Sequence, residues 1–213
     1  MLSGGRKAHR TYLHSLARNI HALFRIAALF VRRYSFAMNT ILLERDGVLK
    51  CKYRNIKLFQ KVVLYRYGGR YAIGNHVQFG YDIGGRCKRG YCELQSRDND
   101  ACISIGDNTA INNNFLAICR NKISIGKNCR IGINCLIMDF EAHSIDPTKR
   151  SIPGEVGEVV IGDNVWIGNN VTVLKNVKVG KNSIIGAGSI VTRDVGENMI
   201  VAGIPARVIR RIE

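Results

Sequence analysis

The sequence predicts an all-β protein built as a parallel β-helix, and a six-residue repeat carries most of that prediction. Between residues 161 and 196, six hexads follow one another without a gap: IGDNVW, IGNNVT, VLKNVK, VGKNSI, IGAGSI and VTRDVG. A period of six fits neither the 3.6-residue turn of an α-helix nor an unbroken alternating strand. The composition agrees, because 22 Gly and only 3 Pro among 213 residues are typical of a turn-rich β protein.

Each position of the hexad has a predicted role. The first position is aliphatic and is expected to point inward: Ile161, Ile167, Val173, Val179, Ile185 and Val191. The fourth is Asn, Gly or Asp, the types that enter left-handed backbone conformations at low cost: Asn164, Asn170, Asn176, Asn182, Gly188 and Asp194. The fifth is small or β-branched. Three hexads would close one triangular coil, and stacked coils would bury the first-position side chains in a continuous ladder.

Residues 1–46 are expected to form a basic segment ahead of the β-helix. The formal net charge is +16, and residues 1–70 hold 15 Lys and Arg against 2 Asp and Glu. Between residues 11 and 31, apolar side chains recur at intervals of three and four, which indicates an amphipathic α-helix. Arg25 interrupts the apolar run, which is shorter than the roughly 18 residues of a membrane span. No small-residue cleavage site follows it, so neither a signal peptide nor a transmembrane helix is predicted.

Two partners for this helix stay open at the sequence level. It would dock on the protein's own coil or a neighbouring subunit, or it would lie on an anionic membrane surface as a peripheral contact. Nucleic acid is a minor option, because no aromatic-basic recognition motif accompanies the charge.

Residues 47–213 are predicted to form the β-helix. Residues 47–70 look like irregular first coils, and clear hexads follow at 73–84, 105–116 and 125–136. The phase breaks at 87–100, which is expected to be a loop at the rim, and slips by two residues around 120–122. The pattern lapses from 137 to 161, so an active-site loop is predicted at 138–160, because loops thrown out of a solenoid often carry function.

Two of the seven cysteines are expected to serve packing. Cys129 and Cys135 occupy fifth positions of hexads, where a small buried side chain is needed. Cys87 and Cys92 could be drawn as half of a zinc site, but no second pair has ligand spacing, and no metal is expected. Scattered free thiols favour a reducing cytoplasm.

The loop at 138–160 contains a histidine close to two carboxylates. His143 follows Asp139 by four residues and Glu141 by two. A carboxylate can hold an imidazole in one tautomer and leave its other nitrogen free to accept a proton. On spacing alone, a surface histidine that lies near acidic residues by chance is an equally good interpretation.

The hexads resemble those of the hexapeptide-repeat acyltransferases, and this resemblance implies a left-handed coil, a known exception to the right-handed crossover rule. The segment from Asp139 to Asp146 resembles the D-x-[DE]-x-H-x-x-D loop of the sugar O-acetyltransferase branch, with Glu141 where Asp is commoner. The resemblance implies that His143 is the general base and that Asp139 and Glu141 orient it. The letters VWIG at 165–168 match the turn that precedes an oxyanion donor, which implies that role for the backbone amide of Asn169.

The similarity to the galactoside and maltose acetyltransferases extends across roughly residues 73–211 and implies acetyl-CoA as co-substrate. It assigns coenzyme A contacts to Trp166, Asn169, Ala187, Thr192, Arg193, Arg207 and Arg210, of which the last two lie in the matching ending AGIPARVIRR. It assigns acceptor contacts to Trp166, Asn112 and Arg120. Arg120 stands where the sugar enzymes place an Asp, so an acidic or phosphate-bearing sugar would suit it.

The leading hypothesis is an acetyl-CoA-dependent O-acetyltransferase that modifies a sugar or surface-polysaccharide precursor. It would act as a cytoplasmic homotrimer, with direct transfer in a ternary complex. The alternative within the enzyme class is an acyltransferase acting on an antibiotic or an amino-sugar nitrogen. A β-helical carbonic anhydrase needs three ligating histidines, but only His76 and His143 lie outside the N-terminal segment. A non-catalytic β-helical scaffold would not need His143, Trp166 and the basic C-terminus together.

Overall fold

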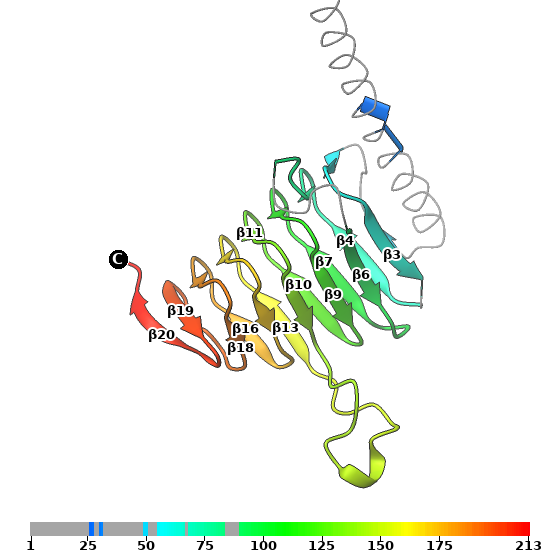
Figure 1. The fold of residues 1–213 in the computed structure, drawn as a ribbon, viewed down its shortest axis with the longest axis vertical. Helices are drawn as coiled ribbons and strands as arrows, with labels where there is room; N and C mark the ends of the chain where they lie inside the picture. Colours follow the sequence, from blue (N-terminus) through cyan, green and yellow to red (C-terminus); the bar gives the residue numbers. More distant parts are fainter. Residues whose placement is uncertain (1–25, 28–29, 32–48, 51–54, 67, 84–89) are drawn as a thin grey trace, which may run out of the picture.

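The chain winds as a three-sided coil whose faces are three sheets (Figure 1). The structure is a computed structural model that describes residues 26–27, 30–31, 49–50, 55–66, 68–83 and 90–213. From Leu49 to Val191, successive strands join sheets A, B and C in turn, and the last two strands of the chain both join sheet B. The predicted all-β fold with parallel strands is therefore confirmed.

Sheet A contains β1 (Leu49–Lys50), β4 (Arg70–Ile73), β7 (Cys102–Ile105), β10 (Lys122–Ile125), β13 (Glu158–Ile161) and β16 (Val177–Val179). Sheet B contains β2 (Lys57–Leu58), β5 (Gln78–Phe79), β8 (Ala110–Ile111), β11 (Arg130–Ile131), β14 (Trp166–Ile167), β17 (Ile184–Ile185), β19 (Met199–Gly203) and β20 (Ala206–Arg211). Sheet C contains β3 (Val62–Arg66), β6 (Cys92–Ser96), β9 (Leu116–Cys119), β12 (Leu136–Met138), β15 (Thr172–Val173) and β18 (Ile190–Val191). The expected C-terminal tail is an antiparallel hairpin of β19 and β20.

The hexad positions behave as the sequence predicts. All six first-position side chains of the stretch 161–196 are at most 2% exposed, and they form part of one continuous core. Fourth-position asparagines have φ values of 56–61°, and Gly188 has φ 74°. Their side chains also form ladders, as where the amide of Asn164 donates to Asn182 at 3.1 Å and Asn182 to Asn198 at 2.9 Å. Asp194 departs from the pattern, because its carboxylate instead accepts the backbone N–H of Lys178 at 2.7 Å.

Two regions interrupt the hexad pattern, and the structure shows what each of them forms. The prediction of a rim loop at 87–100 is wrong for Cys92–Ser96, which form strand β6 and bury Cys92, Leu94 and Ser96. The slip near residue 120 is a real insertion, because facing residues of β7 and β10 are 20 positions apart, whereas facing residues of β13 and β16 are 18 apart. The two extra residues widen the corner between sheets C and A.

The amphipathic helix expected at 11–31 lies outside the described residues, except for Ile26, Ala27, Phe30 and Val31, which are helical and exposed. Among the described residues, no helix is long and apolar enough to cross a membrane. Of Cys87 and Cys92, the two cysteines considered above as half of a zinc site, Cys87 also lies outside the described residues. Within the described part, no three His, Cys, Asp or Glu side chains are grouped as metal ligands.

Candidate active site

One long loop leaves the coil between β12 of sheet C and β13 of sheet A and projects away from it (Figure 1). Its stem is a short antiparallel pairing, in which Glu141 N–H donates to the Glu155 carbonyl at 2.9 Å and Gly157 N–H to the Asp139 carbonyl at 2.7 Å. A 3-10 turn, η2 (Pro147–Lys149), closes the tip. The loop is therefore a structured arm, with His143 beyond its stem.

The His143 ring is fixed by a backbone carbonyl. Its Nδ1 lies 2.8 Å from the carbonyl oxygen of Arg150. A carbonyl can only accept a hydrogen bond, so Nδ1 must carry the proton, and in the neutral ring Nε2 is then the free acceptor. The Arg150 guanidinium in turn donates to the Ser144 carbonyl at 2.9 Å, which ties the two sides of the arm together. This arrangement suits a general base.

Asp139 has a different position from the one expected for a partner of His143. Its carboxylate is buried and accepts the backbone N–H groups of Arg120, Asn121 and Lys122 at 2.7–2.9 Å. The Sγ of Cys119 lies 3.2 Å from it. Burial and the nearby Asp139 charge both raise the pKa of the Cys119 thiol. Asp139 therefore stabilises the widened corner, and the orienting contact to His143 comes from the Arg150 carbonyl.

Glu141 belongs to an ion-pair cluster at the base of the arm. Its carboxylate lies 3.4 Å from Nζ of Lys175, which also binds Glu155. Lys175 lowers the pKa of Glu155, and the Glu155 hydrogen bond is the main cause of the raised pKa of Lys175. The Lys175 side chain is only 19% exposed, so this lysine joins both strands of the stem to the next coil. Glu141 supports the arm rather than the imidazole.

The residues expected at the thioester lie on other parts of the coil. Trp166 stands on the outer face of sheet B and is 57% exposed. Asn169 follows at the corner between sheets B and C. Its side chain accepts the N–H of Ile133, one coil earlier, at 2.9 Å. The residue one coil later is Ala187, whose side chain cannot accept, and no described residue accepts the N–H of Asn169. An unpartnered amide of this kind is what an oxyanion donor requires.

The surface around Ala187 has room for an extended ligand. Gly168 and Ala187 are stacked so closely that a Cβ on Gly168 would lie 2.6 Å from the Ala187 nitrogen. In contrast, a Cβ on the neighbouring Gly188 would meet nothing within 4 Å. The remaining residues expected to contact coenzyme A are all exposed: Thr192, Arg193, Arg207 and Arg210.

Besides Trp166, two residues are expected to contact the acceptor, and they occupy different corners. Asn112 lies at the corner between sheets B and C, the same corner as Asn169, and its side chain accepts the N–H of Asn113 at 2.8 Å. Arg120 lies at the corner between sheets C and A, where its Nε donates to Asp98 at 2.9 Å. Its guanidinium also sits 5.7 Å from the centre of the Phe140 ring. The charge of Arg120 is thus already paired within the chain.

The structure therefore divides the predicted site into two groups. Asn112, Asn169 and Ala187 share the corner between sheets B and C, whereas His143 extends from the corner between sheets C and A. The sequence did not identify Arg150 and Lys175 as supports of the arm. The contact of His143 with the Arg150 carbonyl and the ion pairs of Lys175 leave no local pattern in the sequence, because the partners are not neighbours along the chain.

The chain matches two families of repeats. Residues 158–193 match the family described as bacterial transferase hexapeptide (six repeats), and residues 122–138 match the hexapeptide repeat of succinyl-transferase. A Dictyostelium discoideum protein named as an acetyltransferase is 46% identical over 113 residues, which are 52% of this chain and 58% of that protein. The chain spans 58–66% of the lengths of three such curated relatives.

Two solved structures that are similar in fold are named acetyltransferases. The polySia-specific acetyltransferase NeuO is 26% identical with a TM-score of 0.61, and the similarity covers 73% of this chain and 63% of that one. A galactoside acetyltransferase in complex with coenzyme A is 31% identical with a TM-score of 0.52, covering 67% and 66% of the two chains.

Proposed function

Since this chain is a hexapeptide-repeat protein homologous to proteins named acetyltransferases, we propose that it is an acetyl-CoA-dependent O-acetyltransferase whose acceptor is a sugar or surface-polysaccharide hydroxyl. One observation carries the catalytic part of the proposal. The Arg150 carbonyl fixes the proton on Nδ1 of His143 and leaves Nε2 as a proton acceptor. The left-handed sense of the coil and a cytoplasmic location are part of the same proposal.

The reaction needs a base because a sugar hydroxyl is a weak nucleophile at neutral pH. Nε2 of His143 takes the hydroxyl proton as the oxygen attacks the thioester carbonyl. The developing oxyanion accepts the N–H of Asn169. When the C–S bond breaks, the same imidazole returns the proton to the sulfur. His143 acts on the acceptor hydroxyl itself, so the proposed transfer is direct and both substrates are bound together.

The coenzyme fits the exposed surface near the last coils. Its pantetheine arm would pass over Ala187, where Gly188 leaves open space, beside the wall formed by Trp166. The guanidinium groups of Arg193, Arg207 and Arg210 would meet its phosphates. Within the described residues, these three side chains form no ion pair, so they are available to a ligand.

We further propose that the site forms between two copies in a homotrimer. In one chain the base extends from one corner, while Trp166 and Asn169 belong to the face and corner of sheet B. A second copy related by rotation would bring its own arm to that face. The exposed Ile145 and Ile152 on the arm support this, because apolar side chains at a projecting tip are suited to contact a neighbour.

The test is thiol release from acetyl-CoA with a panel of sugars and glycans. His143→Ala should lower kcat about a hundredfold or more, the usual scale for loss of a general base, while acetyl-CoA binding is retained. Lys149→Ala, an exposed position on the same arm, is the matched control and should behave as wild type. Unchanged turnover in His143→Ala would remove the imidazole from its role.

A mixing experiment tests the shared site. His143→Ala and Trp166→Ala chains, each inactive alone, should regain activity when refolded together, since about a quarter of the interfaces in a random trimer then contain both intact residues. If the mixture stays as inactive as its components, the site is contained within one chain.

A further inference from the structure

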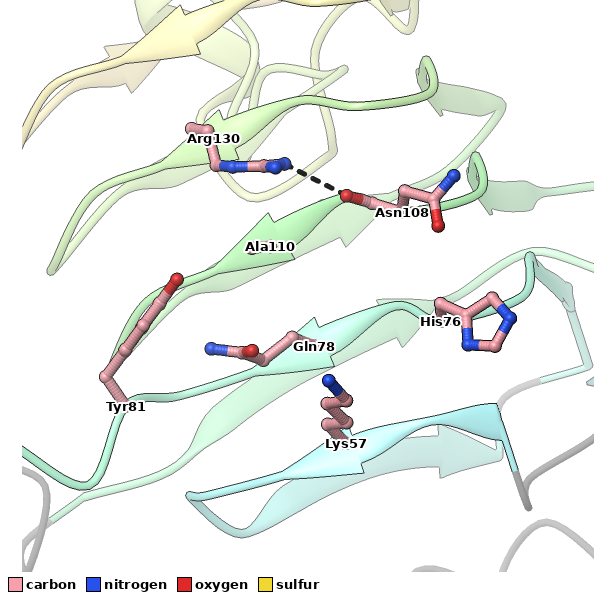
Figure 2. A pocket seen from close by; sticks show the side chains of 7 residues that line it. All are labelled: Lys57, His76, Gln78, Tyr81, Asn108, Ala110 and Arg130. Atoms are coloured by element: carbon pink, nitrogen blue, oxygen red, sulfur yellow. Dashed lines mark hydrogen bonds between the residues drawn. The ribbon is translucent and has the colours of Figure 1, made fainter.

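A hollow of about 360 Å³ lies on the outer face of sheet B, in the early coils (Figure 2). Its floor is Ala110 of β8. The register places Ala110 between Gln78 of β5 and Arg130 of β11, so a small side chain is flanked by two long ones. The hollow therefore follows directly from the choice of Ala at this position.

The hollow is positively charged. Lys57 and Arg130 line it from opposite sides, and none of the lining residues carries a carboxylate (Figure 2). One guanidinium nitrogen of Arg130 donates to the carbonyls of Asn108 and Cys129, both at 2.9 Å. These contacts hold the Arg130 cation in place without neutralising it. Among the described residues, neither Lys57 nor Arg130 has an acidic partner.

Groups that suit a sugar ring surround these two cations. The amides of Gln78 and Asn108 and the imidazole of His76 supply donors and acceptors at the wall. Tyr81 forms one edge, and its ring is stacked against Phe59 with the centroids 6.4 Å apart. An aromatic ring with a polar end can contact both the apolar face and the hydroxyls of a saccharide.

The hollow lies in line with Trp166. The sheet register pairs Ala110 with Arg130 and Arg130 with Trp166, so all three stand in one column on the outer face. Two strand spacings separate Ala110 from Trp166, a distance of about 10 Å. This is on the scale of one or two sugar units, so a chain whose reacting unit lies at Trp166 would place a neighbouring unit in the hollow.

We propose that this hollow binds an anionic sugar unit of the acceptor, next to the unit that is acetylated. The claim that the acceptor runs from Trp166 into the hollow rests on the proposed function. The binding of an anionic sugar follows from the charge and shape of the hollow alone. The anion would be a sugar carboxylate or a sugar phosphate, since both match a fixed guanidinium and an ammonium group.

The binding test compares three six-unit probes: hexagalacturonate, phosphorylated maltohexaose and neutral maltohexaose. We expect one or both charged probes to bind the wild-type protein at least tenfold more tightly than maltohexaose, and the better one identifies the source of the charge. The double variant Lys57→Gln/Arg130→Gln should lose this preference. Ala110→Phe, which fills the hollow without changing the charge, should lose it as well.

A matched control removes the same charge from another face. Arg70→Gln/Lys178→Gln changes two exposed cations on sheet A and should keep the wild-type preference. The proposal is overturned if the three probes bind the wild-type protein equally, or if the control loses as much preference as the double variant.

Thiol release separates this inference from the proposed function. If acetyl-CoA is turned over with charged and neutral acceptors alike, the proposed function stands and the hollow has no role in selection. If charged probes bind selectively but no acceptor supports thiol release, the hollow stands and the proposed acetyl transfer fails.

Discussion

Replacing Asp139 by Ala should destabilise the fold rather than remove a catalytic group. The buried carboxylate accepts three backbone N–H groups from Arg120, Asn121 and Lys122. A hydrogen bond to a charged group contributes about 1.5–3 kcal/mol. The low end applies here because two of the donors, Asn121 and Lys122, belong to exposed residues and the bonds are only partly buried. Three bonds at about 1.5 kcal/mol each predict a loss of about 4.5 kcal/mol in the free energy of unfolding.

The assay is urea unfolding at a fixed protein concentration, because oligomers gain stability with concentration. Asp139→Asn should lose less, since its amide oxygen can still accept two of the three N–H groups. Asp107→Ala is the matched control, because Asp107 accepts a single N–H, from Asn75, at an exposed corner and should cost about 1 kcal/mol. If Asp139→Ala unfolds at the same urea concentration as wild type but loses turnover, the carboxylate serves His143 and this reasoning is refuted.

Three further outcomes follow from the ion pairs and the thiols. Lys175→Met should loosen the arm and lower kcat about threefold to tenfold, with the KM for acetyl-CoA unchanged. A change in KM alone would show that Lys175 does not act by holding the arm. Because Lys175 lowers the Glu155 pKa below its ordinary value of 4.5, this pair should support the arm above that pH and release it as the pH falls through the lowered value. Limited proteolysis against pH would detect the release, and a constant cleavage rate down to pH 3 would contradict it. Burial raises the pKa of Cys92 and Cys135 to about 11, so Ellman's reagent should modify them at pH 8 only after unfolding; rapid modification of either thiol in the folded protein would disprove this.

The repetitive part of the fold could be predicted because its physics is local and recurs. An inward aliphatic such as Ile185 and a left-handed residue such as Asn182 each satisfy a requirement that returns once per hexad. Their positions therefore define the coil without knowledge of any distant contact. The burial of Cys129 and Cys135 was confirmed for the same reason.

The parts that could not be predicted depend on contacts between coils. Strand β6 lacks the glycine and asparagine pattern of a hexad, yet its alternating residues Cys92, Leu94 and Ser96 are buried because β3 and β9 pair with it on both sides. Asp139 looks like a catalytic carboxylate when only its distance from His143 along the chain is known. Its actual partners are 17–19 positions away, at a corner that the sequence shows only as a slip in phase.

The division of the site between two corners follows from the coil itself. A stack of paired strands is stiff, so it cannot bend to bring the base of one corner to the amide of another. The arm is also joined to the preceding coil by Asp139 and to the following coil by Lys175, which limits how far His143 can swing. A rigid arm that projects from one corner reaches a thioester at Asn169 most directly when that residue belongs to a second copy. The contacts that make the arm rigid therefore support our proposal that the site forms between two copies.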